Sequence, residues 1–462
     1  MRVQPRRYLV LAICCMSLLI ISLDVTIVNV ALPAMADDLD APVSGLQWII
    51  DAYLLVLASL LVLAGSTGDR IGRRRVFQAG LALFTIGSLL CSLATSLEAL
   101  IAFRTIQAVG GSMLNPVAMS IITNTFTEPR ERARAIGVWG AVTGFSMALG
   151  PLAGGVLVHS FGWQSIFWIN VPVGIVGFLL AWRFIPESRA EHPRRLDPVG
   201  QLLVFTLLAA LTFGIIEGPS EGWSSPVILG CFALAAAALA ALLWWEPRRE
   251  EPLIELRFFR SAPFSGATLV AICAFASLGG FLFLNTLYLQ DVRGLSALHA
   301  GLYTLPMAVM TIVASPLSGR LVGTRGTRLP LRIAGTAMAL GVLPMILAGP
   351  TTPAWQLFAG YLLFGLGFGM VNTPITNTAV SGMPRARAGV AAAIASTSRQ
   401  VGSALGVAVI GAVVASGSTP ADPAGWWILA ALGAAVLAIG HVTTGAWART
   451  TIARADLDRV PA

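Results

Sequence analysis

Long apolar runs alternate with short polar turns along the whole chain. Each run has about 20 residues, the length that a helix needs to cross the hydrocarbon core of a bilayer. We expect helices because a helix satisfies its own backbone hydrogen bonds in lipid. The pattern therefore predicts an all-α integral membrane protein with fourteen transmembrane helices. The predicted spans are 8–32, 46–66, 77–95, 98–122, 134–158, 166–184, 197–217, 226–245, 263–288, 297–317, 331–348, 355–378, 388–414 and 424–446.

The polar turns predict the orientation of these helices. The turn Gly65–Arg75 follows the second run and holds Asp69 and four arginines. An arginine at a helix centre costs about 2.5–3.5 kcal/mol on insertion scales, so this turn must lie at a membrane face. If both termini and alternate loops share one side, nearly all of the 30 basic residues fall there; Arg293 is outside, and Arg104 and Arg399 are intramembrane. The positive-inside bias makes that side the cytoplasm, so both termini are predicted to be cytoplasmic.

Internal similarity predicts two related halves. The arginine-rich turn has a weaker copy at Ser315–Arg328, and GGSMLNP at Gly110–Pro116 has a counterpart, GFGMVNTP, at Gly367–Pro374. Such repeats are typical of transporters. The spans 197–217 and 226–245 have no counterpart. We therefore expect two pseudo-symmetric six-helix bundles plus two inserted helices, divided into an N-terminal bundle (1–184), an inserted two-helix linker (185–250) and a C-terminal bundle (251–462).

Composition excludes several classes of protein. Only 11% of residues are charged, against about 25% in soluble proteins, and no soluble domain is left between the spans. The basic residues are all arginine, so neither a GxxxxGK[ST] phosphate loop nor a Schiff-base lysine is possible. We expect no nucleotide, nucleic acid or cofactor. The five cysteines lie in apolar runs and the four histidines are scattered, so we expect neither a disulfide nor a metal site.

Three ionisable residues in the first bundle form the candidate proton-coupling site. Asp24 lies about 12 Å inside the outer end of the first span, and Asp51 and Arg104 lie about 8–9 Å inside theirs. Intramembrane carboxylates are costly and usually mark ion or proton pathways. Burial disfavours a charged carboxylate and a nearby guanidinium favours it, so movement of Arg104 would change proton affinity. An Asp–Arg pair that only holds helices together is the alternative interpretation.

Further polar residues are candidates for the cavity and its vestibule. Gln107 lies one turn after Arg104 on the same helical face, although it also fits a polar packing stripe. Glu217, at the outer end of the seventh span, is either a vestibule residue or a solvated interfacial one. The other cavity candidates are Asn29, Asn115, Asn372, Arg399 and Gln400.

The fifth span carries a stripe of small residues. Small side chains allow close approach of helix backbones, and proline bends a helix. We expect this stripe to lie at the interface between the bundles, and packing alone would explain it equally well. Its members are Gly140, Gly144, Gly150, Pro151, Gly154 and Gly155.

Seven motifs, in order along the chain, carry a resemblance to a known family. They include LDVTIVNVALP (Leu23–Pro33), GSTGDRIGRRR (Gly65–Arg75), RTIQAVGGS (Arg104–Ser112) and GPLAGG (Gly150–Gly155). The chain resembles the major facilitator superfamily, specifically its fourteen-helix drug:proton antiporter branch, which includes quaternary-ammonium efflux proteins and actinomycete antibiotic exporters. The resemblance implies two bundles around a central cavity that opens alternately to each side, in the bacterial cytoplasmic (inner) membrane.

The resemblance also implies roles for two motifs. GPLAGG is the motif shared by antiporters. The turn after the second span is a gate that ties the bundles together, although a pure topology signal is the alternative. The gating residues are Gly65, Asp69, Arg70, Gly72 and Arg73.

The predicted function is proton-coupled efflux of hydrophobic drugs or antibiotics, with the proton gradient as energy source. A preference for cations stays open because span 297–317 has no carboxylate. The alternatives are an exporter of one endogenous product, such as a self-made antibiotic or siderophore, and an importer, which GPLAGG disfavours. An intramembrane enzyme would need a catalytic motif and a sensor would need an output domain, and neither is visible. The expected partners are a small hydrophobic substrate, protons and the lipid bilayer, with the chain a monomer.

Overall fold

The computed structural model describes residues 4–190, 196–380, 388–417 and 419–451, and the regular structure in these ranges is helical. A π-helical turn, Tyr288–Val292, extends α10. The helices are α1 (Gln4–Leu39), α2 (Val43–Ile71), α3 (Arg73–Ser92), α4 (Leu97–Thr125), α5 (Pro129–Phe161), α6 (Ser165–Trp168), α7 (Asn170–Phe184), α8 (Pro198–Glu221), α9 (Pro226–Trp245), α10 (Ala262–Leu287), α11 (Ala297–Tyr303), α12 (Leu305–Arg325), α13 (Arg328–Ile346), α14 (Ala354–Val380), α15 (Ala388–Ala415), α16 (Pro423–Thr443) and α17 (Ala446–Thr450).

Each apolar run coincides with a helix, but two of the runs are broken. The run 166–184 is divided into α6 and α7, and the run 297–317 is divided into α11 and α12. A proline, Pro172 or Pro306, lies just after each break. Because proline has no backbone N–H, it fits the first turn of a helix and not its interior. Apolar length alone does not reveal such interruptions.

Twelve helical segments in the described part of the chain are long and apolar enough to cross a membrane. Helices α4 and α5 are not among them. Helix α4 is less apolar because it carries Arg104, Gln107 and Asn115, and in α5 the described apolar stretch is only Leu149–Phe161. The predicted number of fourteen spans is therefore not confirmed, whereas the all-helical, multi-span architecture is.

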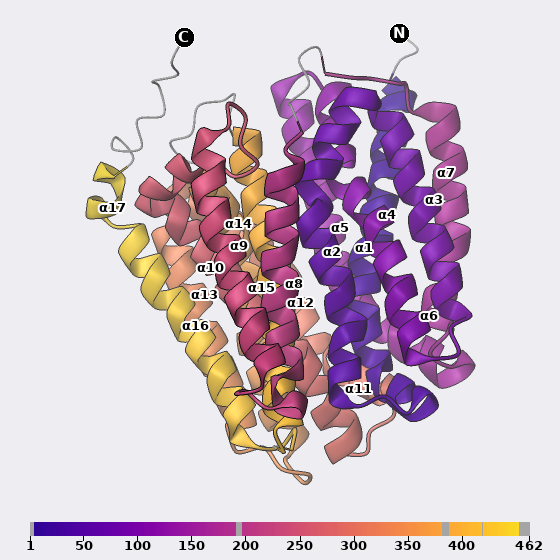
Figure 1. The fold of residues 1–462 in the computed structure, drawn as a ribbon, viewed down its shortest axis with the longest axis vertical. Coiled ribbons are helices and arrows are strands. Elements are labelled where there is room, and N and C mark those ends of the chain that lie inside the picture. Colours follow the sequence, from indigo (N-terminus) through magenta and orange to yellow (C-terminus); the bar gives the residue numbers. More distant parts are fainter. Residues whose placement is uncertain (1–3, 191–195, 381–387, 418, 452–462) are drawn as a thin grey trace. The chain divides into compact units, whose positions relative to one another are not determined.

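The chain forms two compact units, and the first consists of Met1–Gln201 and Leu295–Leu302. It contains α1–α7, drawn from indigo to magenta in Figure 1. Within it, α5 packs on α1, and α4 packs on α2 and α3, while α3 also contacts α7. Buried Tyr53, Phe77 and Phe84 fill the space between these helices. The predicted division at residues 184 and 250 stays a prediction.

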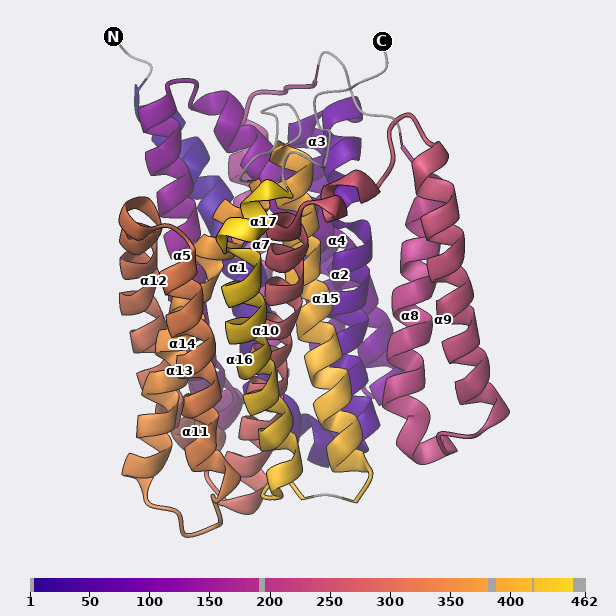
Figure 2. The same ribbon diagram turned by 90° about the vertical axis from the view of Figure 1, so that its left-hand side faces the viewer.

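The second unit consists of Leu202–Gly294 and Tyr303–Ala462. Helix α10 packs on α15 and α16, and α14 packs on α12 and α13 (Figure 2). Aromatic rings fill its interior: Phe281 is stacked on Phe364 with ring centroids 4.3 Å apart and lies edge-on to Trp426 at 6.0 Å. Such pairs add about 0.5–1.5 kcal/mol beyond the burial of their area.

Helices α8 and α9 lie side by side in both Figure 1 and Figure 2. The ring of Phe232 lies so close to Gly214 that an added Cβ would be only 2.9 Å from it. Only 22% of the apolar window of α9 is buried. Most of α9 is therefore an exposed apolar surface, and the insertion of α8 and α9 as an added pair stays a prediction.

Candidate functional site

Asp24 is the centre of a buried polar cluster in the first unit. Its side chain, on α1, is fully inaccessible to solvent and accepts hydrogen bonds from three residues. Oδ2 accepts from Nη1 of Arg104 at 2.5 Å, while Oδ1 accepts from Nε2 of Gln107 at 2.8 Å and from Nδ2 of Asn170 at 3.0 Å. Hydrogen bonds between ionised groups are the strong ones, so Asp24 holds α1 to α4 through a buried ion pair.

Arg104 is held in place by more than its ion pair. Its Nε donates to the backbone oxygen of Ile49 at 3.2 Å, and its Nη1 also donates to Oε1 of Gln107 at 2.7 Å. The guanidinium lies 4.2 Å from the ring centroid of Tyr53 and 5.7 Å from that of Phe167. A desolvated cation over an aromatic ring is stabilised by about 2 kcal/mol. Helices α2, α4 and α6 thus fix the charge that faces Asp24.

Ser88 on α3 connects the amide side chains of the cluster. Its Oγ accepts from Nε2 of Gln107 at 2.7 Å and from Nδ2 of Asn170 at 3.2 Å. The sequence predicted Asp24, Arg104 and Gln107, which the structure brings together, but not Ser88, Asn170, Tyr53 or Phe167. Asn170 had a recognisable signal: an amide inside an apolar run is costly unless it is hydrogen-bonded.

Asp51 lies apart from this cluster. Its side chain on α2 is fully buried, yet neither carboxylate oxygen has a hydrogen-bond partner among the described residues. The ion pairs of the described residues do not link it to Arg104. The structure thus joins Asp24 to Arg104 but records no bond from Asp51 to either of them, and a shared proton-coupling site stays a prediction.

The remaining cavity candidates of the first unit, Asn29 and Asn115, each have a buried side-chain oxygen without a hydrogen-bond partner in the described residues. Nδ2 of Asn29 donates to the backbone oxygen of Val25 at 2.9 Å, but its buried Oδ1 has no partner in the described structure. Oδ1 of Asn115 on α4 is also buried and without a partner there. Unpaired buried acceptors cost free energy unless a ligand or water satisfies them.

Two candidates of the second unit, Asn372 and Arg399, contact Thr376. Nη1 of Arg399, on α15, donates to Oγ1 of Thr376 at 3.4 Å, and that hydroxyl donates to the backbone oxygen of Asn372 at 3.3 Å. Gln400 follows Arg399 and is half-buried. Glu217 lies elsewhere, within α8, where Oγ of Ser220 donates to its Oε2 at 3.0 Å. The vestibule role of Glu217 stays a prediction.

The predicted gating turn has a defined local structure. Both Nε and Nη2 of Arg73 donate to Oδ1 of Asp69, at 2.9 and 2.8 Å. Gly72 joins α2 to α3 with φ of +125°, a conformation that favours glycine. The segment after α7 lies along this turn, since the N–H of Arg73 donates to the backbone oxygen of Ser188 at 2.9 Å. Gly65 is half-buried and Arg70 is exposed. A gating role for these residues stays a prediction.

The glycine stripe of α5 contacts α1 and the start of α11. An added Cβ on Gly150 would collide with the side chain of Thr26, and one on Gly154 would lie 2.8 Å from Cγ1 of Ile27. One on Gly155 would lie 2.8 Å from the backbone oxygen of Ala297. Pro151 is buried between them. Gly140 and Gly144 belong to α5, but the surroundings of their side chains lie outside the described residues.

A sequence model of the family described as Major Facilitator Superfamily matches residues 14–407. The Multidrug resistance protein Stp of Mycobacterium tuberculosis is 37% identical over 401 residues, which cover 87% of this chain and 74% of that protein. The Methylenomycin A resistance protein of Streptomyces coelicolor is also 37% identical, over a region that covers 86% of this chain and 83% of that protein. The Tetracenomycin C resistance and export protein of Streptomyces glaucescens is 37% identical, over a region that covers 88% of this chain and 76% of that protein.

Solved structures share the fold at low sequence identity. A bacterial homologue of the human lysosomal transporter Spinster, inward-facing and unoccupied, has a TM-score of 0.63 at 19% identity and covers 99% of this chain and 100% of its own. The xylose transporter XylE of E. coli, partially occluded and inward open, has a TM-score of 0.66 at 15% identity, with 95% and 97% covered.

Proposed function

The chain belongs to the Major Facilitator Superfamily, and we propose that it exports hydrophobic drugs or antibiotics across a bacterial cell membrane in exchange for protons. As a member of this family it is a multi-span transporter and not an enzyme. Relatives that align with most of the chain bear the names of multidrug resistance and antibiotic export proteins. The proposed energy source is the proton gradient, with no cofactor and with the chain acting as a monomer.

The observation that carries this proposal is the buried pairing of Asp24 with Arg104. A protonated carboxyl group has one O–H donor and fewer acceptor positions than a carboxylate. Oδ1 of Asp24 already accepts two hydrogen bonds, and Oδ2 accepts one from Arg104. A proton on Asp24 would remove the negative charge that Arg104 pairs with and leave a buried guanidinium without its counter-charge. We therefore propose that proton uptake weakens the contact between Asp24 and Arg104, which links protonation to movement of α1 against α4.

Asp51 is the second candidate for the proton. Its buried carboxylate oxygens have no hydrogen-bond partner in the described residues. Carboxyl groups inside a membrane span usually mark ion or proton pathways. We propose that Asp24 carries the transported proton, with Asp51 taking this role if Asp24 does not.

We further propose that α4 and α5 also cross the membrane, which gives fourteen spans and places both termini in the cytoplasm. Helix α4 has 29 residues and α5 has 33, about 43 and 50 Å at 1.5 Å per residue, and both are long enough to span. Buried partners satisfy Arg104 and Gln107, so the polarity of α4 does not prevent insertion. The arginine-rich turns then lie inside, as the positive-inside rule requires.

A narrower substrate range is the second candidate. Two of the Streptomyces relatives are named for resistance to one antibiotic each, methylenomycin A and tetracenomycin C. An exporter of one self-made product would move that product and few others. Transport of a panel of unrelated antibiotics and dyes separates the two: several unrelated substrates support multidrug export, and one alone supports the narrow exporter.

Everted membrane vesicles test the proton-coupled mechanism. With an imposed pH difference, wild-type vesicles should accumulate a substrate of the panel, and Asp24→Asn should reduce uphill accumulation to background. Exchange of labelled for unlabelled substrate, which needs no gradient, should persist and show that the variant is folded. Each pH unit supplies about 1.4 kcal/mol per proton. A membrane potential adds about 2.3 kcal/mol per 100 mV when net charge moves.

Asp37→Asn is the matched control, because Asp37 lies on the same helix but is exposed. It should transport at the wild-type rate. Full uphill transport by Asp24→Asn with the gradient present would remove Asp24 from the mechanism. The same assay on Asp51→Asn would then show whether the proton site passes to Asp51.

A further inference from the structure

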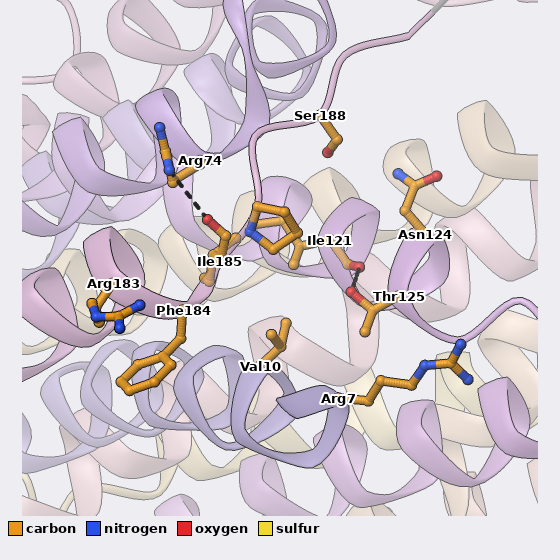
Figure 3. A pocket seen from close by; sticks show the side chains of 11 residues that line it. Arg7, Val10, Arg74, Ile121, Asn124, Thr125, Arg183, Phe184, Ile185 and Ser188 are labelled. Carbon is orange, nitrogen blue, oxygen red and sulfur yellow. Dashed lines mark hydrogen bonds between the residues drawn. The ribbon is translucent and has the colours of Figure 1, made fainter. Parts of the chain in front are cut away.

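A pocket of about 460 Å³ lies in the first unit, and Asp24 is not among the residues that line it (Figure 3). It is surrounded by the start of α1, the start of α3, the end of α4, and the end of α7 with the segment that follows. In Figure 3, Arg183 and Phe184 lie on one side of the pocket and Arg7 on the other, with Val10 between them. No acidic residue is among the described residues that line it.

Three arginines give this pocket excess positive charge. Arg7 lies 3.6 Å from Glu131. Arg74 lies 3.9 Å from Glu187, but it shares that carboxylate with Arg75, which lies 3.7 Å from it. Arg183 has no carboxylate within ion-pair distance in the described part of the chain, and its guanidinium lies 5.5 Å from the ring of Phe184.

One donor in the pocket is also unused. Nε of Arg74 makes no hydrogen bond in the described structure and faces Oε2 of Glu187 only at the ion-pair distance of 3.9 Å. Its Nη1 reaches the backbone oxygen of Ile185 only at 3.5 Å. These long contacts leave hydrogen-bonding capacity on the guanidinium, so an anion with oxygen acceptors would be stabilised here.

Nearby side chains indicate that the pocket lies at the level of lipid headgroups. Trp182, beside Arg183, is 64% exposed, and Tyr8, beside Arg7, is 61% exposed. Exposed Trp and Tyr are typical of the membrane–water interface. Leu179, one turn before Arg183, is also exposed, as expected for a lipid-facing surface.

We propose that this pocket binds the phosphate of an anionic phospholipid headgroup. Arg74 and Arg183 would donate to its oxygens, since a guanidinium matches phosphate geometry with two parallel hydrogen bonds. Val10, Ile121 and Phe184 form an apolar wall that a free phosphate would not use but the glycerol and upper acyl chain of a lipid would. The volume also exceeds what phosphate alone needs and lies in the range of ligand pockets. The bound lipid would join the ends of α1, α3, α4 and α7.

Lipid binding to the purified full-length protein tests this proposal. Native mass spectrometry in detergent should show that phosphatidylglycerol is retained more tightly than phosphatidylcholine. Arg183→Gln should weaken phosphatidylglycerol binding about fivefold, since a basic residue at an anionic surface contributes about 1 kcal/mol. Arg189→Gln is the matched control, because Arg189 is exposed in the segment after α7 but does not line the pocket; its effect should be under twofold.

Three results would overturn the proposal. The first is equal retention of the two lipids, and the second is an equal loss of phosphatidylglycerol binding in Arg183→Gln and Arg189→Gln. The third is displacement of the lipid by millimolar inorganic phosphate. The last result would assign the pocket to a free anion. If Arg183→Gln does not fold, Arg74→Gln gives the same test. Arg183→Lys, which keeps the charge, should retain most of the preference for phosphatidylglycerol.

Discussion

Asp24 and Arg104 are charges that the interior of a membrane protein tolerates only together. Both side chains are almost inaccessible, at 0% and 2% exposure. Loss of one partner leaves the other charge buried and unpaired, which destabilises proteins by about 3–5 kcal/mol. The pair therefore contributes to the integrity of the first unit as well as to proton exchange, and the two roles need separate measurements.

Thermal unfolding of the purified protein measures the structural role. Asp24→Asn and Arg104→Gln should each lower Tm. The double variant should lose less stability than the sum of the losses in the two single variants. The expected coupling is about 0.5–3 kcal/mol, as for residues in one hydrogen-bonded network. Additive losses would mean that the pair does not act as a unit in the folded state.

At the scale of helices, close packing of α5 depends on residues without side chains. Gly155→Ala would place a Cβ 2.8 Å from both the backbone oxygen of Ala297 and Cα of Leu298. Backbone atoms cannot rotate away as a side chain can, so this change should destabilise by about 1–3 kcal/mol. Thermal unfolding and the vesicle transport assay should both detect the loss.

Gly137→Ala on the same helix is the control, because nothing lies within 4 Å of its added Cβ. It should be neutral or stabilise by up to about 1 kcal/mol, since alanine is the better helix former. Equal losses from the two changes would show that helix propensity, not the contact with α11, sets the effect.

At the scale of the whole molecule, the proposed fourteen spans require that α4 crosses the membrane. Thr95 and Thr127 are exposed residues on either side of α4, and cysteines there discriminate the two topologies once the native cysteines are replaced. With fourteen spans, Thr95→Cys should react with an impermeant maleimide on intact cells, and Thr127→Cys only after permeabilisation. Reaction of Thr127→Cys on intact cells would instead support twelve spans.

The sequence by itself determined most of the helices and the charged members of the site. Apolar length and the placement of arginines are local properties of the chain, so the predicted runs coincide with helices, and Asp24, Arg104 and Gln107 stand out as polar residues in lipid. Only the tertiary structure decided which of these residues meet. The rotation of each helix about its axis depends on packing against neighbours. That packing brings Ser88 and Asn170 to Asp24, leaves Asp51 aside, and gathers Arg7, Arg74 and Arg183 from distant parts of the chain around one pocket.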